Sequence, residues 1–160
     1  MYMAFASFPY LSCILLSCVI GLLIILFLPE RRKQEIKWVS AVFSGIPLVL
    51  SLYLFLAYDK SLGGLQFVEK IIWVKSLGIT YFNAADGFNL PNLLLTGIVF
   101  FTGVLTMWEL QSRVKEFYAL YFLLVSGVFG LFMSMDLFFI FVWYDVSLFP
   151  MYLLIVVWGT

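Results

Sequence analysis

The apolar residues of the chain fall into five blocks, each long enough to cross a membrane. A helix needs about 20 mainly apolar residues to span the hydrocarbon core of a bilayer. Short polar or charged segments separate the blocks, which run from about Ala4 to Leu28, Trp38 to Tyr58, Leu90 to Trp108, Phe117 to Met135 and Leu137 to Trp158. The pattern therefore predicts an all-α polytopic membrane protein with about five transmembrane helices.

Local signals predict where several of these helices bend or end. Pro47 lies inside the second block and favours a kink, because proline leaves a backbone carbonyl one turn earlier unpaired. Pro91 lies near the first turn of the third block, where a helix tolerates it best. Asp136 is a candidate N-cap for the fifth helix, and the turn before it is so short that the fourth and fifth helices must be antiparallel neighbours.

Residues 61–89 are too polar to span a membrane and form a connector between the second and third helices. Within this connector, Leu65–Val68 and Ile79–Phe82 have the composition of strands, which favours a hairpin or an interfacial loop. We therefore interpret residues 1–160 as a single membrane domain with residues 61–89 as an outer connector.

The amino-acid composition limits the partners and the chemistry that the chain is expected to have. The chain is 64% hydrophobic, and its nine basic and nine acidic residues give a formal net charge of zero, so the lipid bilayer is the expected environment and nucleic acid is not an expected partner. The chain has no histidine, the commonest general base and metal ligand. Cys13 and Cys18 lie on different faces of a helix and are expected to be packing residues. We expect no metal or cofactor in this chain.

Basic residues predict the orientation in the membrane. The first connector holds Arg31, Arg32, Lys33 and Lys37, and the third holds Arg113 and Lys115. Positively charged connectors face the cytoplasm or matrix, so both should lie on that side and the N-terminus outside. The first block has no preceding basic residue and no small-residue cleavage site, so a cleavable targeting sequence is not expected.

The candidate functional residue is Asp145, the one charged side chain deep within any block. It lies about 4 Å along the helix axis from the midpoint of the fifth block, at 1.5 Å per residue. Two interpretations stay open: a hydrogen-bonded packing residue between helices, or a proton-relay carboxylate paired with a buried cation. Intramembrane carboxylates favour the second. No Lys or Arg of this chain lies at a matching depth, so a partner would come from other helices.

Three further residues are candidates to support Asp145. Pro150 cannot donate to the carbonyl of Val146, which leaves a place for water beside the acid or else merely bends the helix. Ser147 is a candidate to supply part of the hydrogen bonding that Pro150 removes. Tyr144 directly precedes the acid. Small residues of the third and fourth helices are expected to serve close helix packing, and tryptophans near the ends of the blocks to anchor at the interface.

A family resemblance rests on three segments. The stretch from Arg113 to Leu120, Asp136-Leu-Phe, and Asp145-Val-Ser-Leu-Phe-Pro-Met-Tyr-Leu-Leu-Ile resemble the antiporter-like chain M subunit of respiratory complex I. The connector from Glu69 to Asp86 resembles that of the same family. The resemblance covers most of residues 65–160, and its most specific part is Pro-Met-Tyr-Leu-Leu-Ile with an acid five residues before its proline.

The resemblance implies that Asp145 occupies the position of a buried glutamate that pairs with a lysine on a later helix. Family members have about fourteen helices, so the chain would be a natural fragment, half of a split subunit or a truncated product. Asp145 stands where the family has Glu, and Tyr144 where it usually has Trp. The shorter aspartate would need a closer helix or a bridging water to reach the lysine.

These observations predict a membrane-arm subunit of proton-pumping NADH:quinone oxidoreductase, in the bacterial cytoplasmic membrane or the mitochondrial inner membrane. Its expected partners are the other membrane-arm subunits and the missing later helices, which leaves all redox chemistry to other subunits. Two alternatives stay open: a subunit of a multisubunit cation/proton antiporter or membrane-bound hydrogenase, and a truncated structural piece without transport activity.

Overall fold

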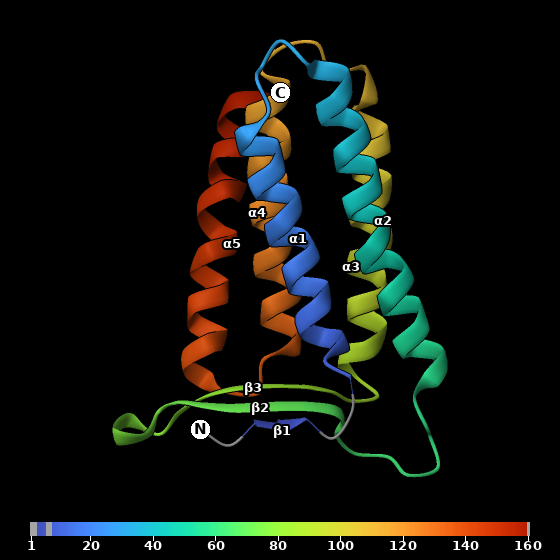
Figure 1. Cartoon of the computed structure of the whole chain (residues 1–160), viewed down its shortest axis with the longest axis vertical. Coiled ribbons are helices and arrows are strands. Elements are labelled where there is room, and N and C mark those ends of the chain that lie inside the picture. Colours follow the sequence, from blue (N-terminus) through green and yellow to red (C-terminus); the bar gives the residue numbers. More distant parts are fainter. Residues whose placement is uncertain (1–2, 6–7, 160) are drawn as a thin grey trace.

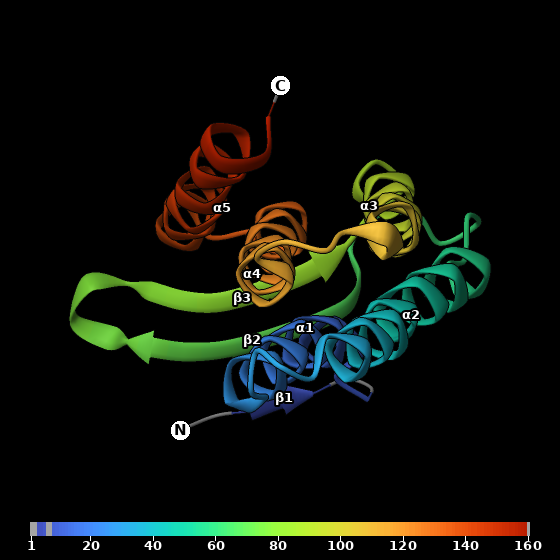
Figure 2. The same cartoon turned by 90° about the horizontal axis from the view of Figure 1, so that it is seen from above.

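A computed structural model describes residues 3–5 and 8–159, and its long helices stand side by side with a small sheet across one end (Figure 1). Five described helices are long and apolar enough to cross a membrane. Seen along the helices, α5, α4 and α3 form one row and α1 and α2 lie beside it (Figure 2). The predicted fold class, mainly helical with five spans, is confirmed.

The observed helices follow the predicted blocks, with differences at their ends. The bounds are α1 Tyr10–Phe27, α2 Lys33–Ala57, α3 Asn89–Thr106, α4 Val114–Met133 and α5 Leu137–Trp158. Helix α2 takes in the polar first turn that the apolar pattern leaves out, and α1 starts after Pro9 rather than near Ala4. The start of the first apolar block is not helical, because Met3–Phe5 form strand β1.

The connector between α2 and α3 folds as the predicted hairpin. Strand β2, Gln66–Val74, pairs antiparallel with β3, Ile79–Ala85, and the short 3-10 turn Lys75–Leu77 joins them. Both strands are longer than their apolar segments suggest. Strand β1 adds to the free edge of β2, giving the order β1-β2-β3. The sheet crosses the ends of the helices (Figure 1), and the N–H of Met135 donates to the carbonyl of Phe82 at 2.8 Å, which ties β3 to the turn between α4 and α5.

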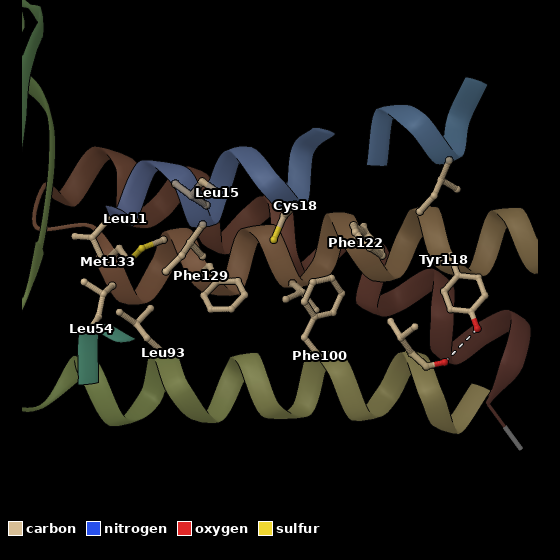
Figure 3. Close-up of a cluster of buried hydrophobic side chains, with 14 of the residues drawn as sticks. Leu11, Leu15, Cys18, Leu54, Leu93, Phe100, Tyr118, Phe122, Phe129 and Met133 are labelled. Carbon is tan, nitrogen blue, oxygen red and sulfur yellow. Dashed lines mark hydrogen bonds between the residues drawn. The ribbon is translucent and has the colours of Figure 1, made fainter. Parts of the chain in front are cut away.

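Helix α4 is the centre of the bundle, since it packs against α1, α3 and α5. Its buried aromatic side chains Tyr118, Phe122 and Phe129 belong to one hydrophobic core with Cys18 of α1 and Phe100 of α3 (Figure 3). The rings of Phe122 and Phe100 meet edge to face, with centroids 4.8 Å apart. The Tyr118 hydroxyl is satisfied by the carbonyl of Val104 at 3.2 Å. Cys18 is a free, buried thiol, as expected of a packing residue.

Glycines let the helices approach one another closely, as the small-residue pattern predicts. A Cβ at Gly97 of α3 would lie 3.1 Å from the Cα of Leu48 of α2. On α4, a Cβ at Gly127 would lie 2.8 Å from the backbone nitrogen of Ser147, and Gly130 makes room for the ring of Trp143. The contact between α4 and α5 therefore depends on two glycines.

The basic connectors lie together at the end of the bundle opposite the sheet (Figure 1). The ammonium of Lys33 donates to the carbonyl of Gln111, and that of Lys37 to the carbonyl of Trp108, both at 2.6 Å. Lysine near a helix C-terminus satisfies free carbonyls and complements the helix dipole. Trp38 and Trp108 make an edge-to-face contact at this end, with ring centroids 5.2 Å apart.

Asp136 caps α5, as the sequence predicts, and also holds the sheet. Its carboxylate accepts from the N–H of Phe138 at 2.9 Å and from the N–H of Thr80 on β3 at 3.0 Å. The hydrogen bond from Thr80, and then that from Phe138, keep the pKa of the Asp136 carboxyl below its ordinary value. The ionised form is therefore favoured by folding.

An Asp136→Ala variant is expected to unfold at lower temperature than the parent protein at neutral pH. Because folding lowers the pKa of Asp136, its contribution is present above the ordinary carboxyl pKa and is lost as pH falls through the lowered value. Thermal unfolding of both proteins in micelles across acidic pH measures this. The two midpoints should converge in acid, and a difference that is independent of pH would contradict the assignment.

Candidate functional site

Asp145 lies in the ninth position of the 22-residue helix α5, within about 4 Å of its midpoint along the axis. The other charged side chains of the five described α-helices lie within the first five residues of α2 and the first three of α4. Over residues 3–5 and 8–159, Asp145 forms no ion pair and no side-chain hydrogen bond. Asp145 thus lies near the middle of the helix, and no cation among these residues pairs with it.

The packing of α5 points Asp145 away from the other described helices. Trp143 and Ser147 lie against the glycines of α4, and each is two residues from Asp145, or about 200° around the helix at 3.6 residues per turn. Asp145 is exposed on the opposite face. Helix α5 packs mainly on α4, and Pro150 is its one buried residue.

The surface around Asp145 is otherwise apolar. Its exposed residues are Phe141, Val142, Tyr144, Leu148, Phe149 and Tyr152. A charged side chain at the centre of a bilayer costs about 2.5–3.5 kcal/mol on insertion scales. Such residues usually face a bundle interior or a water-filled cavity rather than lipid. The arrangement can therefore hold a proton or bind a cation once another polar group covers it.

The three supporting candidates lie on different faces of α5. Tyr144 is 49% exposed, on the same side as the acid. The Ser147 hydroxyl, on the side of α4, donates to the carbonyl of Tyr144 at 2.8 Å rather than to that of Val146. Pro150 lies within the unbroken helix and is buried. The structure thus places Ser147 and Pro150 near Asp145 along the chain but does not turn their side chains toward it.

A second carboxylate, Glu69 of β2, is buried and was missed by the sequence interpretation. It is 2% exposed and accepts hydrogen bonds from the backbone N–H groups of Leu11 and Ser12 at 2.8 and 3.0 Å, and from the Ser12 hydroxyl. Burial raises the pKa of Glu69, and these hydrogen bonds oppose that rise. No sequence signal marks it, because Glu69 is one of several charged residues of the connector and is followed directly by Lys70.

The described residues hold no cluster of three or more histidine, cysteine or acidic side chains that could bind a metal ion. The candidate sites of proton chemistry are Asp145, because of its position in α5, and Glu69, because of its burial. They lie on separate elements, one in the middle of α5 and the other beside the first turn of α1.

Comparison with known proteins gives relatives along nearly the whole chain, while no family model matches it. The chain is 34% identical over 155 residues to NAD(P)H-quinone oxidoreductase chain 4 2 of Microcystis aeruginosa, covering 96% of this chain and 28% of that protein. It is 33% identical over 156 residues to chain 4 of Prochlorococcus marinus, covering 96% and 29%. For the chloroplastic chain 4 of Chara vulgaris the identity is 35% over 154 residues, covering 96% and 31%.

The chain thus spans less than a third of the length of these relatives. Identity above 30% over 96% of the chain takes in both the hairpin and the five helices, so the relationship does not rest on apolar composition alone. Over this part of their length, the chain is similar to the NAD(P)H-quinone oxidoreductase chain 4 proteins.

Proposed function

We propose that the chain belongs to a membrane-arm subunit of an NADH:quinone oxidoreductase and contributes to proton translocation coupled to quinone reduction. The observation that carries the proposal is Asp145, a carboxylate at mid-depth on a helix face that no described helix covers. The names of the relatives support the reaction class. The redox chemistry takes place on other subunits.

In this proposal Asp145 binds and releases a proton as the charge beside it changes. A cation on a further helix, packed on the exposed face of α5, stabilises the ionised carboxylate. When the cation moves away, the low dielectric around the site favours the neutral acid. The carboxylate thus takes up a proton in one state and gives it up in the other. The surface supports this role because the exposed side chains around the acid are aromatic or aliphatic, as a helix-packing face requires.

The proposed orientation places the sheet and the N-terminus outside and the basic connectors on the cytoplasmic or matrix side. Lys33, Lys37, Arg113 and Lys115 all belong to the end of the bundle opposite the sheet. This clustering supports the assignment, since positive charge near short connectors sets the orientation of membrane helices.

Purification of the protein with its bound partners tests the assignment to this complex. Gentle solubilisation of its native membrane should recover peripheral subunits that oxidise NADH together with the chain. Recovery with only membrane-embedded partners and no NADH oxidation would favour the alternative, a cation/proton antiporter or membrane-bound hydrogenase subunit. Recovery without any further helices against α5 would favour a structural piece without transport activity.

A further inference from the structure

A buried polar cluster lies where the sheet meets the helices, well away from Asp145. Its centre is Glu69, whose carboxylate receives hydrogen bonds from the first turn of α1. Pro9, the N-cap of α1, has no side-chain hydrogen bond of its own, so Glu69 caps this helix from a strand 57 residues away.

Capping alone does not require a carboxylate. A neutral amide oxygen accepts the same N–H groups, whereas a buried charge costs far more unless a cation compensates it. Within the described part of the chain, Glu69 forms no ion pair. Lys70, the nearest cation along the strand, points to the other face of the sheet, where its ammonium lies 5.2 Å from the ring centroid of Phe82.

Two hydroxyl groups connect Glu69 to the surface. The Ser12 hydroxyl donates to Oε2 of Glu69, and its oxygen lies 3.1 Å from the Tyr81 hydroxyl. Both Ser12 and Tyr81 are half-buried, whereas Glu69 is buried. The chain Glu69–Ser12–Tyr81 thus leads from a closed interior to the surface at the sheet end of the bundle.

An unsatisfied donor lies beside the same cluster. Asn83 is the cross-strand neighbour of Glu69 and is 1% exposed, and its Nδ2 has no hydrogen-bond partner in the described structure. Buried polar groups are nearly always paired, and an exception often marks a bound water. Its Oδ1 lies 3.5 Å from the hydroxyl of Ser134, at the end of α4. The polar cluster therefore extends from α1 to the turn before α5.

We propose that Glu69 is a second proton-binding carboxylate, which exchanges protons with the aqueous phase at the sheet end through the hydroxyls of Ser12 and Tyr81. Inward transfer moves a proton from water to Tyr81, the proton of Tyr81 to Ser12, and that of Ser12 to Oε2 of Glu69. Each hydroxyl ends with one proton, and the carboxylate becomes a neutral acid. A water held at Nδ2 of Asn83 completes the cluster.

The surroundings suit such an exchange. Among the described side chains, the titratable groups around Glu69 are Tyr81 on β3 and Cys13 on α1. Asp136 lies farther along the sheet, held by Thr80. Asp145 follows Asp136 by nine residues, about 13 Å along α5 at 1.5 Å per residue. Glu69 therefore lies at the end of the bundle that a proton from Asp145 would reach on its way out.

The role of Glu69 in translocation rests on the proposed function, but its protonation does not. Infrared difference titration of the protein, purified with the subunits that stay bound to it, detects the carbonyl stretch of a buried carboxylic acid. The band should titrate above the ordinary pH range of glutamate and vanish in Glu69→Gln, which keeps an acceptor for the N–H groups of α1. Absence of any band that depends on Glu69 would overturn the proposal, whatever the protein translocates.

Translocation itself gives the second measurement. In vesicles with the assembled protein, Glu69→Gln should slow proton release at the sheet side at least threefold, and small permeant weak acids should restore it. Glu30→Gln, an exposed carboxyl at the opposite end, is the matched control and should behave as the parent protein. Two results would contradict the proposal: an assembled Glu69→Gln protein that releases protons at the parent rate, or one whose slowed release is not restored by weak acids. Glu69 would then serve only as a cap of α1. Loss of function through misfolding would appear as failed assembly, and Ser12→Ala, which interrupts the hydroxyl chain, then provides the same test.

Discussion

Asp145→Asn is expected to abolish most proton translocation while the protein still assembles. Asparagine has nearly the shape of aspartate but carries no exchangeable carboxyl proton, and Asp145 makes no contact with the described helices that its loss would break. A positioned proton-transfer group contributes about 10²- to 10⁴-fold to the rate of its step. We expect the rate of proton translocation to fall at least about 100-fold, the low end of what such a group supplies. The measurement is proton uptake by vesicles during quinone reduction.

Asp145→Glu is the matched variant, because it keeps the carboxylate and adds one methylene. It should retain translocation, since the longer side chain reaches a partner at least as easily. Unchanged proton yield in a fully assembled Asp145→Asn protein would remove the relay role. Loss of translocation in Asp145→Glu as strong as in Asp145→Asn would mean that shape rather than proton exchange is what the site requires.

Gly127→Ala is expected to destabilise the protein by separating α5 from α4. The added Cβ would lie 2.8 Å from the backbone nitrogen of Ser147 and 3.0 Å from the carbonyl oxygen of Trp143. Neither atom belongs to a flexible side chain, so the helices themselves must move. Overpacking of this kind costs about 1–3 kcal/mol. Denaturant titration in mixed micelles measures the change in the free energy of unfolding.

Gly45→Ala is the control, with the same chemical change in a helix that has space for it. The nearest atom to its added Cβ is Cε2 of Phe101, at an ordinary contact distance of 3.8 Å. Replacing glycine by alanine inside a helix stabilises it by about 0.5–1 kcal/mol when nothing clashes. The two variants should therefore shift stability in opposite directions. Equal shifts would contradict the close contact between α4 and α5.

Most of the fold could be predicted from the periodicity and the length of the apolar blocks. The bilayer fixes the length of a spanning helix, which is why α5 begins and ends at the predicted residues Leu137 and Trp158. Asp136 was identified as its cap from residue type and position alone. Helix α2 begins earlier than its apolar block, and its polar start is held by hydrogen bonds from Lys33 and Lys37 to carbonyls of the connector that follows α3.

The contacts across the sheet could not be predicted, because they join segments far apart in sequence. Strand β1 pairs with β2 across more than sixty residues, as Met3 faces Ile71. The burial of Glu69 depends on that sheet lying against the N-terminus of α1. Read in sequence, Glu69 is one charged residue among several in a polar connector, and nothing local distinguishes it.

In the candidate site, too, the sequence predicts what depends on neighbouring residues but not what depends on contacts between helices. Hydropathy identifies Asp145 as an acid at mid-depth, and the absence of a matching Lys or Arg predicts that its partner lies elsewhere. The face on which it lies depends on Gly127 and Gly130, whose contacts with α5 turn Trp143 inward and Asp145 outward. That orientation required the structure.

The central claim is that Asp145 is half of a site completed by a cation on a further helix. An experimental structure of the protein assembled in its native membrane tests it most directly. We expect a helix packed on the exposed face of α5, with a lysine ammonium in hydrogen-bonding distance of the Asp145 carboxylate, directly or through one water. Lipid chains or wholly apolar side chains against Asp145 would contradict the account.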